Sequence, residues 1–207
     1  MIEIAIRKKI KTYKGNRELQ VDTVFPDQSV TKIYGPSGAG KTTFLKILAG
    51  LVVPEQGFIT AEGEVWLDTA NKINKPPQQR RVGFVFQDYA LFPNMTVTEH
   101  LQFATKDHQL INRLLYIGRM ENFSSQRPAH LSGGQQQRLA ILRALALKPS
   151  LLLLDEAFSA LDDELRENLI TDLKILLTEF ETTTLVVSHH AQETIGFADH
   201  SLKIDLE

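Results

Sequence analysis

The chain has 207 residues, of which 43% are hydrophobic and 23% charged, and this composition is typical of one globular domain with a well-buried core. Its 23 lysines and arginines nearly balance 25 acidic residues, and a net charge of −2 gives no global positive field for nucleic acid or an anionic bilayer. The absence of cysteine excludes disulfides and thiolate metal sites. No apolar run reaches the roughly 18 residues needed to cross a bilayer, so we expect a cytoplasmic protein.

Short strands dominate the N-terminal third of the chain. Apolar and polar residues alternate from the first residues onward, and Gly, Asn and Asp interrupt the pattern. This pattern predicts strands at 2–10, 18–25, 29–34, 57–61 and 64–68. One helix is predicted to begin near Lys41.

After residue 75, strands alternate with helices. Strands are predicted at 82–86, 151–154, 184–188 and near 201–204, and helices from about Thr98 to Tyr116 and from Gln135 to Leu147. A further helix is predicted from an apolar stripe at helical spacing, formed by Leu161, Leu165, Leu169, Leu173, Leu176 and Phe180. The alternation indicates an α/β fold with a central, mostly parallel sheet.

The segment GPSGAGKT lies between a predicted strand and a predicted helix, which is the context that a phosphate-binding loop requires. Its residues are Gly35, Pro36, Ser37, Gly38, Ala39, Gly40, Lys41 and Thr42. The glycines let backbone N–H groups turn toward an anion, Lys41 can reach the β- and γ-phosphates, and the Thr42 hydroxyl can ligate Mg²⁺. The segment therefore predicts a nucleoside-triphosphate pocket; the alternative is a glycine-rich turn that binds nothing.

The apolar strand LLLL ends in Asp155 and Glu156. Carboxylates at the carboxyl end of a parallel strand lie where doubly wound sheets bind ligands. Asp155 is placed to hold the Mg²⁺ shell, and Glu156 to accept a proton from an attacking water. The alternative for Glu156 is a solvated acid that caps a helix.

The segment LSGGQQQR places two glycines in the first turn of a predicted helix. Ser132 and Gln135 have the spacing of a capping box, but that motif does not explain Gly133 and Gly134, because glycine in a helix costs about 1 kcal/mol relative to alanine. Two glycines do supply bare backbone at a positive helix end, where phosphate can approach closely. A single chain could not comfortably wrap one triphosphate with both loops. We therefore expect this second cradle to close over a nucleotide held by another copy.

The order of these motifs resembles that of the ATP-binding cassette (ABC) ATPases, and the resemblance extends from about residue 2 to the C-terminus. RRVGFVFQDYALFP is similar to the Q-loop of that family, with Gln87, and FSALD to its D-loop, with Asp162. VVSHH resembles the segment of the switch histidine, with His189, and Tyr13 resembles the aromatic residue that stacks on adenine. Residues alone leave other roles open, since Tyr13 could pack in a strand and Gln87 and His189 could be satisfied polar residues at strand ends.

The resemblance implies a P-loop NTPase fold of the ABC type across 1–207, with an N-terminal antiparallel β-subdomain. It also implies an inserted helical subdomain at 88–130. Many importer ATPases carry a C-terminal regulatory domain, and we expect none here because the sequence ends at Glu207, shortly after the last predicted strand. Two ATP molecules would be sandwiched in a homodimer, with phosphates on Lys41 and the backbone of 38–43, including Thr43. Thr42, Gln87 and Asp155 would surround Mg²⁺, Glu156 would polarise the water, and His189 would contact the γ-phosphate. The cradle residues Ser132, Gly133, Gly134 and Gln135, together with Asp162, would act from the opposite subunit.

The Q-loop segment is most similar to the ATPase subunits of bacterial importers for molybdate, sulfate or ferric iron, with molybdate as the leading expectation. Such a subunit would bind integral membrane permease subunits at the inner face of the membrane, serve a solute-binding protein indirectly, and bind no nucleic acid. The alternatives are a soluble ABC ATPase and the ATPase of an exporter. Four apolar residues could line a groove for a permease helix or form local core: Tyr89, Leu91, Phe92 and Pro93.

Two positions depart from the family pattern. Ala157 stands where many relatives have proline, and His190 stands where an acidic residue often follows the switch histidine. The choice of His189 over His190 therefore rests on the alignment with the family.

Overall fold

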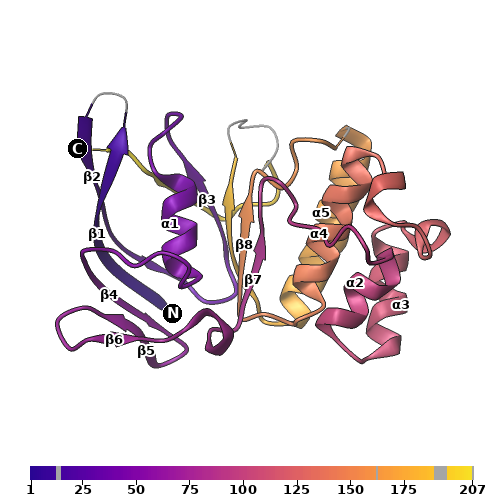
Figure 1. Cartoon of the computed structure of the whole chain (residues 1–207), viewed down its shortest axis with the longest axis horizontal. Helices are drawn as coiled ribbons and strands as arrows, with labels where there is room; N and C mark the ends of the chain where they lie inside the picture. Colours follow the sequence, from indigo (N-terminus) through magenta and orange to yellow (C-terminus); the bar gives the residue numbers. More distant parts are fainter. Residues whose placement is uncertain (13–14, 162, 189–194, 207) are drawn as a thin grey trace.

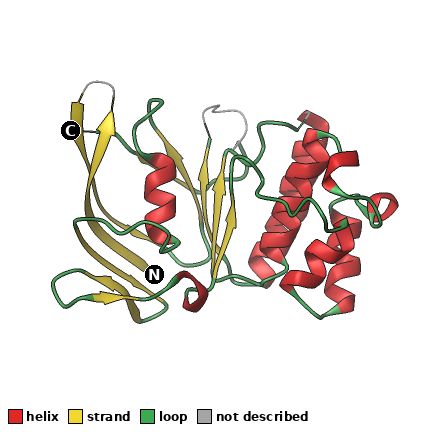
Figure 2. Ribbon diagram, in the orientation of Figure 1, coloured by secondary structure: helices red, strands yellow, loops and turns green. Residues whose placement is uncertain are grey.

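The protein is described by a computed structural model that covers residues 1–12, 15–161, 163–188 and 195–206. Within these ranges the strands form two sheets of five. Figure 1 shows the antiparallel sheet at one end, helix α1 between the sheets, and the longer helices on the far side of the parallel sheet. Figure 2 shows the same division, with most of the helical structure gathered at one end of the molecule. The predicted α/β fold is confirmed.

The first sheet has the strand order β2-β1-β4-β5-β6 and is antiparallel. Ile2, Ile4 and Ile6 are buried on one face while their neighbours are exposed, as the alternation predicts. Its strands are β1 (Ile2–Thr12), β2 (Gly15–Phe25), β4 (Gln56–Ala61), β5 (Glu64–Asp68) and β6 (Ile73–Asn74).

The second sheet has the order β10-β3-β9-β8-β7, and all its neighbouring strands are parallel. The apolar run LLLL lies in it, and all four leucines are fully buried. Leu151 and Leu153 face the core that contains α1, whereas Leu152 and Leu154 face the core of the longer helices. The strands are β3 (Val30–Tyr34), β7 (Val82–Val85), β8 (Leu151–Asp155), β9 (Thr183–Val187) and β10 (His200–Lys203).

Helices cover both faces of the parallel sheet (Figure 1). Helix α1 (Lys41–Leu48) buries Phe44 and Leu45 between the sheets, and α4 (Gly133–Leu145) and α5 (Asp163–Glu179) pack on the opposite face. Short 3₁₀ turns lie at Pro77–Gln79, Glu121–Phe123 and Pro128–His130. None of the helices in the described ranges is long and apolar enough to cross a membrane.

The single helix predicted from Thr98 to Tyr116 is wrong, because the structure has two helices there. They are α2 (Val97–Ala104) and α3 (His108–Ile117). Thr105 is extended, and the Asp107 carboxylate caps α3 by accepting hydrogen bonds from the N–H groups of Gln109 and Leu110. The break contains neither glycine nor proline, so no breaker residue marks it in the sequence.

A buried arginine joins α1 to the antiparallel sheet. Arg80 is 4% exposed and donates hydrogen bonds to five oxygens at distances from 2.8 to 3.3 Å. The acceptors are Ile47 O and Leu48 O at the end of α1, Trp66 O in β5, Lys75 O and Asn74 Oδ1. Burial lowers the pKa of Arg80 to about 10, so the guanidinium keeps its charge at neutral pH.

Candidate functional site

The register of the parallel sheet brings three distant loops to one edge. Ile33 pairs with Val187, and Val187 pairs with Asp155, so the ends of β3, β9 and β8 lie level. Strand β7 pairs with β8 so that Val85 lies opposite Leu154. The loops that follow β3, β7 and β8 therefore share this edge, which is the usual position of ligands in α/β sheets.

The loop after β3 has the conformation of an anion-binding turn. Gly40 has a φ of 87° and is the N-cap of α1, a conformation that side chains rarely adopt. Among the described residues no side chain caps this helix end, and its first turn contains no acidic residue. The free N–H groups and the positive end of the helix dipole are therefore available to an anion.

The Lys41 side chain lies within this loop. Its Nζ donates hydrogen bonds to Gly35 O and Pro36 O, each at 2.9 Å, and the residue is only 6% exposed. Burial lowers the pKa of Lys41, while the negative charges of Glu156 and Asp155 oppose that shift. The loop thus places the Lys41 ammonium beside the space that its backbone N–H groups face.

Asp155 ends β8 and is 2% exposed. Burial raises its pKa, a hydrogen bond from the Thr42 hydroxyl lowers it, and the charge of Glu156 raises it further. Its Oδ1 atom is buried without a hydrogen-bond partner. A buried carboxylate oxygen lacking a donor, beside a threonine hydroxyl, fits Mg²⁺.

Nowhere in the described ranges do three or more His, Cys, Asp or Glu side chains group closely enough to hold a metal by themselves. Magnesium commonly takes one or two protein oxygens and completes its shell with water and substrate phosphates. The pair Asp155 and Thr42 therefore suits a metal that arrives with a phosphate ligand.

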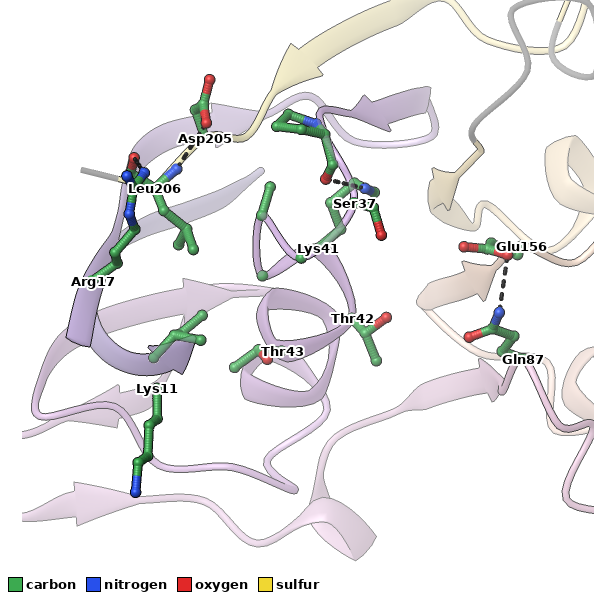
Figure 3. Close-up of a pocket in the computed structure, with 15 residues that line it drawn as sticks. Lys11, Arg17, Ser37, Lys41, Thr42, Thr43, Gln87, Glu156, Asp205 and Leu206 are labelled. Atoms are coloured by element: carbon green, nitrogen blue, oxygen red, sulfur yellow. Dashed lines mark hydrogen bonds between the residues drawn. The ribbon is translucent and has the colours of Figure 1, made fainter. Parts of the chain in front are cut away.

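Glu156 and Gln87 face each other at the same edge (Figure 3). The Nε2 atom of Gln87 donates a hydrogen bond of 3.1 Å to Glu156 Oε2. Glu156 is half-buried and has a φ of 54°, in the left-handed region that residues other than glycine seldom occupy. Eight other non-glycine residues in the described ranges share this region, so the site rests on the contacts of Glu156 and not on its backbone angle.

These groups line a cavity of about 640 Å³, a size that suits a nucleotide. The phosphate loop is defined as residues 35–42. Its residues 36–42 line the middle of the cavity together with Thr43, and Gln87 and Glu156 lie at one side (Figure 3). At the other side lie residues that the sequence analysis did not identify: Ile10, Lys11, Arg17, Asp205 and Leu206.

The C-terminal segment reaches this cavity through contacts with β2 and the phosphate loop. Arg17 Nη1 donates to Leu206 O at 3.3 Å, and Leu19 forms a β-bridge with Leu206. A Cβ atom on Gly35 would lie 2.0 Å from Ile204 O, so only glycine allows this approach. Nothing local in the sequence signals these residues, since only the folded chain brings residues 204–206 beside the loop.

The second cradle, residues 132–135, is formed as a capping box at the start of α4. Gln135 N–H donates to Ser132 Oγ at 3.3 Å, and Ser132 N–H donates to Gln135 Oε1 at 2.8 Å. A Cβ on Gly133 would meet nothing within 4 Å, whereas one on Gly134 would lie 3.1 Å from Ala160 O. Gly133 therefore leaves open space in front of the helix end, and Gly134 permits close packing against the turn that follows β8.

The cradle does not line the cavity of the phosphate loop within the described part of the chain. Among the described residues of one copy of the protein, the glycine-rich starts of α1 and α4 therefore do not share one cavity. The capping box accounts for Ser132 and Gln135, and packing accounts for Gly134, but neither accounts for the exposed Gly133.

Three predicted site residues lie outside the described residues: Tyr13, Asp162 and His189. The four apolar residues of the Q-loop segment differ in burial. Tyr89 and Leu91 pack on the core of the longer helices, while Phe92 and Pro93 are exposed. Local core therefore accounts for the first two residues, and the groove for a permease helix remains a prediction.

Comparisons with known proteins agree with this geometry. The family model described as ABC transporter matches residues 20–159. The chain is 38% identical over 198 residues to the molybdenum import ATP-binding protein ModC of Photobacterium profundum, covering 95% of this chain and 55% of that protein. It is 42% identical over 187 residues to the sulfate/thiosulfate import ATP-binding protein CysA of Mycobacterium tuberculosis, covering 86% and 52% respectively.

Among solved structures, the dimeric ATP-binding cassette MJ0796, in a post-hydrolysis state bound to ADP and Pi, superposes with a TM-score of 0.84. It has 28% sequence identity, and the match covers 99% of this chain and 94% of that one. The chain spans about half the length of the curated relatives it matches. Since the family model covers more than half of its residues and the site has the expected loops, this protein belongs to the ABC transporter family.

Proposed function

We propose that this protein binds and hydrolyses ATP as the energy-coupling subunit of a membrane importer. The observation that carries the proposal is the cavity lined by Lys41, Thr42, Glu156 and Gln87, with the buried carboxylate of Asp155 beside Thr42. A glycine loop at a helix end, a lysine and two carboxylates constitute the chemistry of phosphoryl transfer to water. Relatives named as import ATP-binding proteins support the biological role.

The phosphate loop binds the triphosphate. Backbone N–H groups at the start of α1 donate to phosphate oxygens, and the Lys41 ammonium exchanges its two carbonyl acceptors for the β- and γ-phosphates. Thr42 and Asp155 would hold Mg²⁺, with Gln87 beside them, and the metal would neutralise charge on the phosphates. Tyr13 would stack on the adenine, as the family resemblance implies.

Hydrolysis proceeds with Glu156 as the general base. Water oxygen bonds to the γ-phosphorus, its proton passes to the Glu156 carboxylate, and the bond from that phosphorus to the β–γ bridging oxygen breaks. Gln87 lies within hydrogen-bond distance of Glu156 Oε2, so its amide can orient the attacking water. We assign contact with the γ-phosphate to His189 by the resemblance.

A second copy completes each site. The cradle at 132–135 does not line the cavity of its own chain among the described residues, and its Gly133 faces open space. In the proposed dimer this cradle covers the nucleotide in the facing subunit, with Asp162 beside it. The dimeric MJ0796 cassettes support such an assembly. Hydrolysis then removes the γ-phosphate that holds the two copies together.

The transported solute does not contact this subunit, so its chemistry is taken from the relatives. We infer an oxyanion, with molybdate as the first candidate and sulfate as the second. Residues 88–130 would act as the helical subdomain of a single cassette and receive the permease, with Phe92 in the contact. The protein would lie in the cytoplasm at the inner face of the membrane, and a solute-binding protein would be an indirect partner.

The experiment that tests the site is Glu156→Gln, followed by size measurement with and without ATP and Mg²⁺. The amide keeps the shape of the side chain but accepts no proton, so we expect turnover to fall on the order of 100-fold or more. ATP should then accumulate in a stable dimer. Glu167→Gln, which changes an exposed acid of α5, is the matched control. Wild-type turnover in Glu156→Gln would remove Glu156 as the base.

A second measurement tests the transport role. When the protein is isolated from cells, an integral membrane partner should co-purify with it. That partner should stimulate its ATPase activity. Salt-sensitive binding to DNA or RNA with ATPase stimulation by nucleic acid would contradict the importer assignment.

A further inference from the structure

The turn that carries Glu156 is held by contacts within the turn and from other elements. Its residues are 156–160, and it begins with the left-handed backbone of Glu156. Glu156 N–H donates to Val187 O at 3.1 Å, and Ser159 Oγ donates to Glu156 O at 3.0 Å. A residue in this backbone region depends on such contacts to keep its conformation.

One buried amide spans the two ends of this turn. Gln137, in α4, is fully buried, and its Nε2 donates to Glu156 O at 3.1 Å. Its Oε1 accepts from Ala160 N–H, also at 3.1 Å. Both halves of the amide are therefore used, one on each end of the turn. A buried polar group with both partners satisfied rigidifies the segment that it contacts.

The face of α4 that carries Gln137 also approaches residues 156–160 near the start of the helix, at Gly134. Gly134 and Gln137 are three residues apart and lie on one side of the helix. A Cβ on Gly134 would stand 3.1 Å from Ala160 O, so the helix backbone itself lies close to the turn. The cradle at 132–135 begins this helix, and α4 continues without interruption to Leu145.

We propose that Gln137 is a positioning residue that ties the backbone of Glu156 to the cradle end of α4. This inference rests on the proposed function, since it concerns the same reaction. When the cradle of one copy docks on the nucleotide of its partner, α4 moves as one body. Gln137 passes that movement to Glu156 in its own copy. The general base of each subunit thus responds to the nucleotide bound in the other subunit, which makes the two sites cooperative.

Gln137→Glu is the sharpest test. Glutamate keeps the length of the side chain and can still accept from Ala160 N–H, but in its ionised form it presents an oxygen instead of a donor to Glu156 O. We expect kcat to fall about 100-fold, because a small misplacement of a catalytic group has an effect of that order. The affinity for ATP should stay within about two-fold of wild type, and the Hill coefficient for ATP should fall toward one.

The matched control is Thr182→Val. Thr182 is 2% exposed, and its Oγ1 donates to Pro149 O at 2.7 Å, beyond the opposite end of β9 from the site. This variant also loses a buried hydrogen bond, so its melting temperature should fall, but kcat and the Hill coefficient should remain those of wild type. If Gln137→Glu does not fold, Gln137→Met replaces it, because methionine has similar length and fills the same space.

The double variant Gln137→Glu with Glu156→Gln separates positioning from assembly. It should form the ATP-bound dimer at the same ATP concentration as Glu156→Gln alone. A Gln137→Glu variant with the kcat and Hill coefficient of wild type would overturn the inference. The inference would also fail if Thr182→Val lowered kcat and the Hill coefficient as much as Gln137→Glu does. If the unsubstituted protein does not hydrolyse ATP and Glu156→Gln forms no ATP-dependent dimer, the proposed function itself fails.

Discussion

Two helices of this protein begin with glycine-rich segments, and the two beginnings differ in how they treat their backbone donors. Helix α1 starts after Gly40, which has a left-handed backbone and no side chain, so the N-cap residue supplies no side-chain cap. Helix α4 starts after Ser132, which forms a capping box with Gln135. The first helix end has Lys41 and two carboxylates around its cavity, whereas the second lies outside that cavity in the described structure.

In the proposed function, bare backbone at a helix end does not by itself make a complete phosphate site. Around the phosphate loop, one copy brings together Lys41, the buried Asp155 and Glu156, which in the proposed function supply charge, a metal position and a base. The cradle has open space at Gly133, and in the proposed dimer it covers a nucleotide held by the other copy. We therefore expect substitutions in the phosphate loop to abolish binding, and substitutions in the cradle to spare binding while blocking assembly.

Lys41→Ala should have the largest effect. Removing the ammonium leaves the β- and γ-phosphates without their charged donor, and we expect ATP affinity to fall on the order of 100-fold or more. Titration with a fluorescent ATP analogue measures the loss, and circular dichroism checks the fold. Lys174→Ala, on the exposed side of α5, serves as the control. Unchanged affinity in Lys41→Ala would refute the assignment of the phosphate loop.

Ser132→Arg should spare binding and block closure. The long side chain fills the space in front of α4, so ATP should bind the isolated subunit while ATP-dependent dimerisation disappears and turnover falls about 100-fold. Light scattering with the Glu156→Gln background measures dimerisation. Ser132→Thr keeps an N-cap hydroxyl and is the matched control. A normal dimer with normal turnover in Ser132→Arg would disprove the shared site.

Alanine substitutions at one glycine of each segment should change stability in opposite directions. Gly40→Ala forces alanine into a φ of 87° and should lower the free energy of unfolding by about 1–2 kcal/mol. Gly133→Ala places alanine in a helix with open space around its Cβ and should raise it by about 0.4–1 kcal/mol. Urea denaturation gives both values.

The Gly133→Ala variant also tests the proposed role of the cradle in turnover. Gly133→Ala should slow turnover in spite of its added stability, because in the proposed dimer the new methyl group would lie where the phosphate held by the partner approaches. A stabilised Gly133→Ala variant with full activity would mean that Gly133 is not required for phosphate contact.

Ser132→Ala should have the smallest effect. It removes the hydroxyl that accepts from Gln135 N–H, and loss of such a cap costs about 1 kcal/mol or less at an exposed helix end. The midpoint of urea unfolding should shift accordingly. No shift at all would show that the capping box contributes nothing to the stability of α4.

The sequence predicts the centre of the site better than its surroundings. GPSGAGKT and LLLLDE are contiguous, and their chemistry follows from residue type and from flanking strands and helices. The pairing of Gln87 with Glu156 depends on the register between β7 and β8, which no local pattern reveals. Gln137 carries no signal either, since a glutamine in a polar run of a helix is indistinguishable from a solvated one.

The same limit applies to the fold. The fully apolar β8 and the alternating β1 are predicted correctly, because burial on two faces and on one face leave different patterns. The break between α2 and α3 is missed, since Asp107 marks it only through the hydrogen bonds of its carboxylate. The segment KPPQQRR is typical of a solvent-exposed loop, yet Arg80 within it is buried.

Burial of Arg80 has a consequence for the way the protein unfolds. Its five acceptors come from α1, from β5 and from the segment just before Arg80 itself, so the guanidinium is fully hydrogen-bonded only when all three are in place. If any one of these three elements unfolded alone, the buried Arg80 guanidinium would lose hydrogen-bond acceptors, which is strongly unfavourable for a buried charge. The antiparallel sheet and helix α1 should consequently melt as one cooperative unit, with shared hydrogen-exchange protection across both.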